Sequence, residues 1–208
     1  MTKSIAFWSG ILGVVFFVVA TFLAGLQFSE YSHVSQYISE SYATGTPYGV
    51  QLRYLGFIPS GILLLIFSIG AIKVLPKSTF TVIGLLGIGI FYGGGTIVCG
   101  FFPCDAGCNR EWINPSQSQV IHNFSGSLTY LIVPVCLILA GIGARKWNGS
   151  KQVSYLGIAV GVVCVIFVGV LSSNPSSPYA GLFQRIIESS VLLWIVVCSF
   201  YIRKATII

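Results

Sequence analysis

Six long runs of mainly apolar residues alternate with short polar segments along this chain of 208 residues. A helix needs about 20 mainly apolar residues to cross the hydrocarbon core of a bilayer. The predicted spans cover about residues 5–26, 54–72, 80–102, 120–144, 153–171 and 186–202. Apolar and polar positions do not alternate within these runs, as they would in the strands of a β-barrel. The pattern therefore predicts an all-α polytopic membrane protein with six transmembrane helices.

The composition excludes a soluble globular protein. Only 8% of the residues are charged, against roughly 25% in ordinary soluble domains. The links between the spans are short, so we expect a single transmembrane domain over residues 1–208, with the lipid bilayer as its surroundings. The first apolar run is longer than the core of a signal peptide, and we interpret it as a retained helix.

The positive charges predict the orientation, because cytoplasmic loops carry excess Lys and Arg. If both termini are cytoplasmic, eight of the eleven basic residues lie inside: Lys3, Lys73, Lys77, Arg145, Lys146, Lys151, Arg203 and Lys204. The opposite side then carries both histidines and all five acidic residues. The net charge of +6 is thus a signal of topology, and we expect no nucleic-acid partner.

Small residues spaced four apart predict close helix packing. Gly89 and Gly93 have this spacing in the third span, and Gly157 and Gly161 have it in the fifth. We favour packing within one bundle over a dimer interface, which leaves a homo-oligomer open. Prolines inside the second and fourth spans, at positions 59 and 134, are candidates for kinks.

Two of the six cysteines differ from the others. Cys104 and Cys108 bracket a polar turn at the outer end of the third span, on the side where disulfides persist. A disulfide is the favoured interpretation, and a redox-active pair or a thiolate metal site are the alternatives. The other four cysteines lie inside apolar runs and are expected to be buried apolar residues.

Ionisable and polar residues gather at the outer ends of the spans, where such groups are candidates for function. The candidate ligand-binding residues are Asp105, His122, Asn123, Arg185, Glu188, Arg53, Glu40 and His33. Arg185 and Glu188 share a helix face and can pair; inside the boundary, Glu188 needs a cation or a water-filled cavity. These residues form either a polar pocket under the first outer loop or a solvated rim of headgroup-level charges.

Several short motifs resemble those of the DUF998 family of prokaryotic multi-spanning membrane proteins. They are Phe102-Pro103-Cys104-Asp105, the helix start at Gln119 to His122, and Gly181-Leu182-Phe183-Gln184-Arg185 followed by Trp194. The resemblance implies that Asp105, His122 and Arg185 match polar positions of the family. The cysteine pair is not part of that pattern, and Gln184 stands where the family usually has an acidic residue. The family name supplies no reaction, and the cofactor is unknown.

Three functions remain open. The first is binding or transport of a lipid headgroup or a small polar or anionic molecule near Arg185 and His122. The second is a hydrolase-like or metal-dependent enzyme, with His122 and Asp105 as catalytic candidates and His33, His122 and Asp105 as weak metal-ligand candidates. The third is a structural or accessory subunit. The short loops indicate the inner (plasma) membrane of a prokaryote.

Overall fold

The computed structural model describes residues 2–204 and contains six helical spans long and apolar enough to cross a membrane. They are Lys3–Leu26, Gly49–Val74, Thr79–Phe101, Gln117–Ala144, Lys151–Ser173 and Ala180–Lys204. No strand occurs within the described residues. The predicted all-α architecture with six spans is confirmed.

Two of the spans change their helical pitch along their length. The second consists of α2 (Gly49–Leu52), the π-helical η2 (Arg53–Phe57) and α3 (Ile58–Val74). The third consists of α4 (Thr79–Gly87), the π-helical η3 (Ile88–Gly94) and α5 (Gly95–Phe101). Such wide turns are rare overall, and those that occur lie frequently at functional sites. An apolar run does not distinguish them from an α-helix, so the sequence did not predict them.

The other four spans are continuous helices: α1 (Lys3–Leu26), α6 (Gln117–Ala144), α7 (Lys151–Ser173) and α8 (Ala180–Lys204). α6 continues through Pro134. α8 begins at Ala180, well before the predicted start near residue 186. Its first turn packs against the first loop, where the Leu182 amide donates to the Val34 carbonyl at 2.8 Å.

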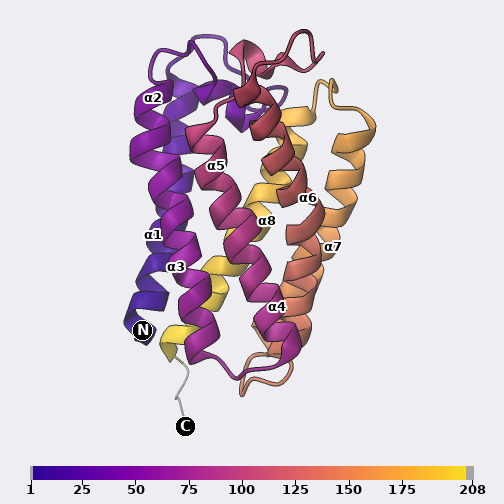
Figure 1. The fold of residues 1–208 in the computed structure, drawn as a ribbon. Coiled ribbons are helices and arrows are strands. Elements are labelled where there is room, and N and C mark those ends of the chain that lie inside the picture. Colours follow the sequence, from indigo (N-terminus) through magenta and orange to yellow (C-terminus); the bar gives the residue numbers. More distant parts are fainter. Residues whose placement is uncertain (1, 205–208) are drawn as a thin grey trace.

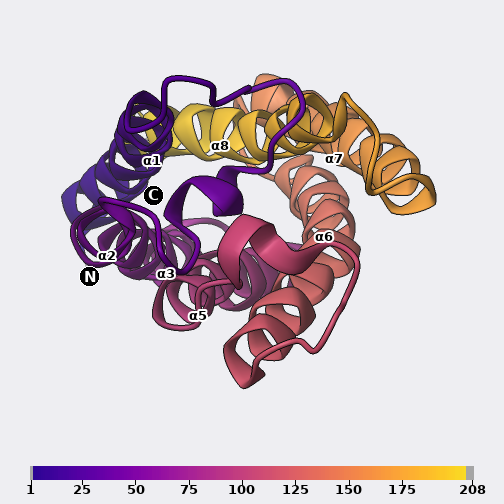
Figure 2. The ribbon, with the colours of Figure 1, turned by 90° about the horizontal axis from the view of Figure 1, so that it is seen from above.

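The six spans form a ring in which each packs against the next. α1 contacts α3, the third span contacts both α3 and α6, α6 contacts α7, α7 contacts α8, and α8 returns to α1 (Figure 2). α1 begins and α8 ends at the same end of the bundle, which we call the terminal end (Figure 1). The two long polar loops lie at the opposite end, which we call the loop end.

Glycines allow the closest approaches within this ring. A Cβ atom on Gly157 would lie 3.0 Å from Cα of Gly141 in α6, and one on Gly161 would lie 2.9 Å from the Pro134 carbonyl oxygen. Gly89 and Gly93 face α3 in the same way, with Ser68 and Leu65 as neighbours. The small-residue pairs therefore pack within the bundle, as favoured from the sequence.

Two short 3₁₀ helices cover the loop end. η1 (Ile38–Tyr42) lies in the first loop and η4 (Ala106–Asn109) in the loop between α5 and α6. Figure 2 shows both above the middle of the ring. They contact each other, and the Thr44 amide donates to the Cys104 carbonyl at 2.9 Å. The two loops together form a lid over the ends of the spans.

Candidate functional site

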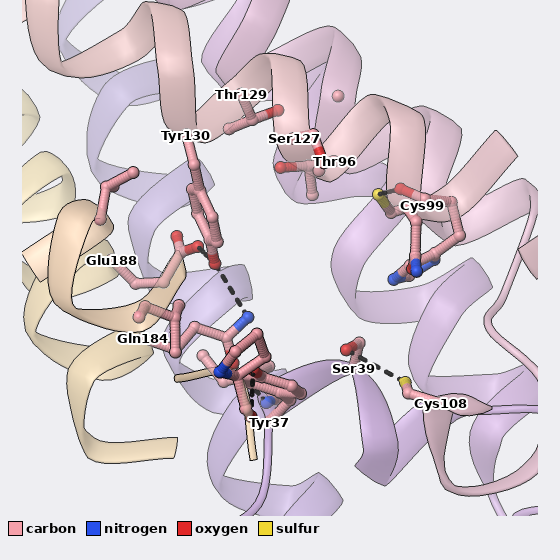
Figure 3. Close-up of a pocket in the computed structure, with 18 of the residues that line it drawn as sticks. Tyr37, Ser39, Thr96, Cys99, Cys108, Ser127, Thr129, Tyr130, Gln184 and Glu188 are labelled. Atoms are coloured by element: carbon pink, nitrogen blue, oxygen red, sulfur yellow. Dashed lines mark hydrogen bonds between the residues drawn. The ribbon is translucent and has the colours of Figure 1, made fainter. Parts of the chain in front are cut away.

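A cavity of about 590 Å³ lies beneath this lid, and we call it the loop-end cavity. All six spans contribute to its walls. The roof includes η1 and the loop between α5 and α6, residues 102–116, which we call the cysteine loop. Figure 3 shows Glu188, Tyr130 and Gln184 together on one wall and Cys99 across from them. Leu131 also lines the cavity while 65% of its surface is exposed, so the cavity reaches the outer surface of the bundle beside α6.

Glu188 is the charged group at the centre of this site. Its side chain is only 8% exposed, yet it lines the cavity. The Tyr92 hydroxyl donates to one carboxylate oxygen at 2.6 Å, and the Tyr130 hydroxyl donates to the other at 2.9 Å. Gln184 lies one helical turn before Glu188 and donates from Nε2 to the Tyr130 oxygen at 2.8 Å. Three spans thus converge on one carboxylate.

Arg185 faces away from Glu188 and holds the first loop in place. Its guanidinium donates to the carbonyls of His33 at 2.7 Å and Gln36 at 2.8 Å, and to the Tyr31 hydroxyl at 2.8 Å. The pair that this spacing allows between Arg185 and Glu188 does not form. Residues three apart on a helix can meet, but here the backbone of the loop and the two tyrosines offer each group nearer partners.

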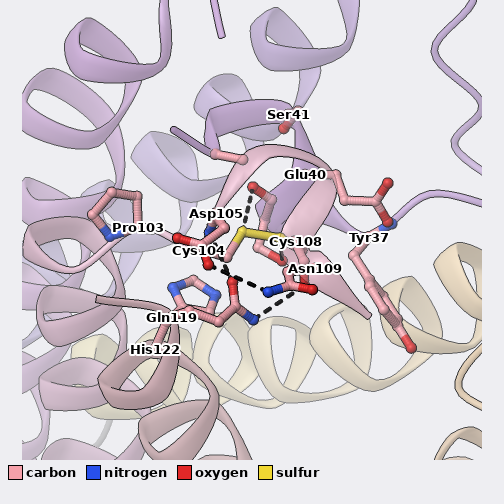
Figure 4. The surroundings of a disulfide bond; sticks show 12 residues. Tyr37, Glu40, Ser41, Pro103, Cys104, Asp105, Cys108, Asn109, Gln119 and His122 are labelled. Carbon is pink, nitrogen blue, oxygen red and sulfur yellow. Dashed lines mark hydrogen bonds between the residues drawn. A yellow bond between two sulfur atoms is a disulfide. The ribbon is translucent and has the colours of Figure 1, made fainter. Parts of the chain in front are cut away.

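The cysteine loop is organised around a disulfide between Cys104 and Cys108, as favoured from the sequence (Figure 4). Gln119, whose side chain is 0% exposed, accepts from the Asp105 amide at 2.7 Å and donates to the Cys108 carbonyl at 3.1 Å. The Ser39 hydroxyl of η1 lies 3.2 Å from the Cys108 sulfur. The disulfide loop is thereby attached both to α6 and to the first loop.

Asp105 caps this loop and does not line the cavity. Its carboxylate accepts from the Ser116 amide at 3.0 Å, at the start of α6. Hydrogen bonds from the side chain and backbone of Ser116, and then from Asn109, hold the pKa of Asp105 below its usual value. A carboxylate at a helix N-terminus is also favoured by the helix dipole. These contacts fix Asp105 within the cysteine loop, outside the cavity.

His122 and Asn123 line the loop-end cavity, as the pocket hypothesis requires. The Nδ1 atom of His122 lies 2.9 Å from the Phe102 carbonyl oxygen. Because a carbonyl only accepts, Nδ1 carries the proton. The structure gives no hydrogen bond between His122 and Asp105 within residues 2–204, so the base and orienting residue of the enzyme hypothesis are not in contact.

The remaining candidates lie outside the cavity. Arg53 donates to the Gly49 carbonyl of its own helix at 3.1 Å. Glu40 forms an ion pair with Arg110 and accepts from the Tyr37 amide at 2.9 Å. His33 is exposed beside Tyr31, and partial burial followed by the nearby Arg185 charge lowers its pKa. Among the described residues, no three His, Cys, Asp or Glu side chains are grouped to hold a metal ion.

The family model described as "Protein of unknown function (DUF998)" matches residues 11–201, which is most of the chain. The chain belongs to the DUF998 family. No curated protein and no solved structure matches it. The three polar residues matched to DUF998 motifs lie in different places in the structure. His122 lines the cavity, Asp105 caps the cysteine loop and Arg185 anchors the first loop.

Sequence reasoning missed several cavity residues of this DUF998 chain. Tyr92 and Tyr130 lie inside apolar runs, where a tyrosine has an apolar ring and a hydroxyl that needs a partner. Gln184 was noted only as a departure from the family pattern, although its spacing of four from Glu188 places both on one helix face. Arg110 lines the cavity and lies over the Tyr37 ring at 4.4 Å, which no local pattern indicates.

Proposed function

We propose that this DUF998 protein binds the headgroup of a lipid or a small polar molecule in the loop-end cavity. The observation that carries the proposal is the convergence of Tyr92, Tyr130 and Glu188, from three separate spans, on a cavity of about 590 Å³. A buried carboxylate within a span is costly unless it has a function or a partner. Polar groups that converge in a mainly apolar cavity are typical of ligand sites.

The ligand reaches the cavity from the side of the bundle in this proposal. Leu131 on α6 and Ser172 on α7 both line the cavity and are both exposed. Nearer the terminal end, α6 and α7 are in close contact at Gly161 and Pro134. A gap confined to the loop-end half of these two helices admits a molecule from one leaflet and not from the other.

Binding is favoured over transport through the membrane. Beyond the cavity, the interior of the bundle is filled by buried apolar side chains such as Leu137, Trp194 and Ile195. The expectation of an anionic ligand depended on Arg185. The Arg185 guanidinium is directed to the carbonyls of the first loop and does not face the cavity. Within residues 2–204, His122 and Asp105 form no hydrogen bond, so the hydrolytic alternative lacks its pair of base and orienting residue.

Filling the cavity tests this proposal. Gly126 lines the cavity, and a Cβ atom added to it would meet nothing within 4 Å. We expect Gly126→Phe to fold and to lose the lipid or solute that the wild-type protein retains in native mass spectrometry. Gly169→Phe is the matched control, since Gly169 has the same free space but does not line the cavity. Equal retention by both variants, or no retained mass in the wild type, would contradict the proposal.

We also propose that the loop end is extracytoplasmic, because the excess of Lys and Arg lies at the terminal end. Ser173 at the loop-end terminus of α7 and Lys146 in the α6–α7 link are both exposed. In a Cys99→Ala background, we expect a membrane-impermeant maleimide to label Ser173→Cys in intact cells. Lys146→Cys should react only after permeabilisation. The reverse labelling pattern would show that the bundle is inserted the other way round.

A further inference from the structure

We propose that the loop-end cavity selects a ligand that carries a positively charged ammonium group. This inference rests on the proposed function, namely that the cavity takes up a polar ligand, and it names the chemistry of that ligand. The argument combines a hydrogen-bond network of defined direction, a buried carboxylate without a counter-charge, and an aromatic lining.

The network around Glu188 has a direction that starts at a backbone amide. The Ile38 amide donates to Gln184 Oε1 at 2.7 Å, which fixes the orientation of the Gln184 side chain. Gln184 Nε2 must then be the donor to the Tyr130 oxygen. Tyr130 has only one proton, so it donates that proton to Glu188. Glu188 therefore accepts on both oxygens, from Tyr130 and Tyr92.

No cation within residues 2–204 pairs with this carboxylate. The nearest arginine in sequence, Arg185, is directed to the carbonyls of the first loop. Arg110 lines the cavity, but it is ion-paired with Glu40. A buried charge is retained only when it is paired or contacts water in a cavity. Arg110 and Glu188 both line the cavity, but only the Arg110 charge has an ion-pair partner within residues 2–204.

Aromatic rings surround the same space. Tyr37, Tyr42, Tyr92, Trp112 and Tyr130 all line the cavity. The faces of such rings attract cations, and cages of them bind quaternary ammonium groups. The cavity already contains one example, because the Arg110 guanidinium lies 4.4 Å from the centre of the Tyr37 ring. A carboxylate flanked by tyrosines matches an ammonium group better than it matches phosphate or a carboxylate.

The test compares two thiol reagents that differ in charge and share one reactive group. Ser127 lines the cavity, is exposed, and has no hydrogen-bond partner in the described part of the chain. Ser127→Cys is made in a Cys99→Ala background, because Cys99 is partly exposed and lines the cavity. The other three free cysteines are buried and can stay. Purified protein in detergent is treated with the trimethylammonium-ethyl or the sulfonato-ethyl methanethiosulfonate. Ser173→Cys, which lies outside the cavity, supplies the ratio of the two rates without it.

We expect the cationic reagent to modify Ser127→Cys about tenfold faster than the anionic one after division by the Ser173→Cys ratio, as expected for one charge at close range. Glu188→Gln should bring the corrected ratio close to one, and its elution in size exclusion shows whether it has folded. Equal corrected rates without the Glu188 substitution would overturn the cation preference and leave the proposed function standing. Modification of Ser173→Cys but not of Ser127→Cys would overturn both, since no polar molecule then enters.

Protection experiments distinguish the source of the ammonium group. Tetramethylammonium chloride slows modification of Ser127→Cys if the ligand is a free amine. Nanodiscs of phosphatidylcholine slow it, relative to nanodiscs of phosphatidylglycerol, if the ligand is a lipid headgroup. Either result supports the proposal when Glu188→Gln removes the protection. Protection by neither would overturn it, even if the charge preference is present.

Discussion

Gly157→Leu is expected to disrupt the packing of α7 against α6. A Cβ atom on Gly157 would lie 2.7 Å from Nε1 of Trp194, 3.0 Å from Cα of Gly141 and 3.2 Å from the Leu137 carbonyl oxygen. Backbone atoms of α6 can move away only if the two helices separate. Overpacking of this kind costs about 3 kcal/mol, which corresponds to a fall of about 10 °C in Tm for a chain of this size.

The matched control for this substitution is Gly169→Leu in the same helix. A Cβ atom there would meet nothing within 4 Å, so we expect a change in the free energy of unfolding within about 0.5 kcal/mol. Both variants are heated in detergent, and the remaining monodisperse fraction is measured by size exclusion. If Gly157→Leu is as heat-stable as Gly169→Leu, then α6 and α7 do not approach each other as described.

Arg185→Ala is expected to release the first loop. The substitution removes donors to His33, Gln36 and Tyr31, and hydrogen bonds from charged groups contribute about 1.5–3 kcal/mol each. We expect a loss of several-fold or more in hydrogen-exchange protection over residues 28–42, together with a lower Tm. Arg185→Lys should recover only part of the protection, because one ammonium group cannot reproduce the planar fork of the guanidinium.

Arg53→Ala is the control for the Arg185 experiment. Within residues 2–204 the Arg53 side chain donates only to the Gly49 carbonyl of its own span, so its loss should leave exchange in the first loop unchanged. Equal protection of residues 28–42 in the wild type and in Arg185→Ala would contradict the anchoring role. A fall in Tm without a local change in exchange would also contradict it.

The spans could be predicted because apolarity is a local property of the sequence. Glu188 could be predicted as a site residue for the same reason, since an acidic residue inside an apolar run stands out. The role of Arg185 could not. Two of its acceptors are backbone carbonyls 149 and 152 positions earlier in the chain, and a backbone carbonyl has no signature in the sequence.

The tyrosines were missed for a different physical reason. Tyrosine is expected at membrane interfaces, where its hydroxyl reaches water, so its presence in a span does not by itself indicate a buried hydrogen bond. Tyr92 lies in the π-helical η3, and its hydroxyl reaches α8 across the ring. Both the wide turn and the arrangement of the spans are needed to place Tyr92 beside Glu188.

The closure of the ring between α8 and α1 has a consequence for biosynthesis. Chains are made from the N-terminus at about 5–20 residues per second, so the first loop is complete long before α8 emerges from the ribosome. The anchor of that loop, Arg185, and the acidic residue of the cavity, Glu188, both lie in α8. The first five spans are therefore made before either Arg185 or Glu188 is present, and insertion of the last span supplies the loop anchor and the cavity carboxylate together.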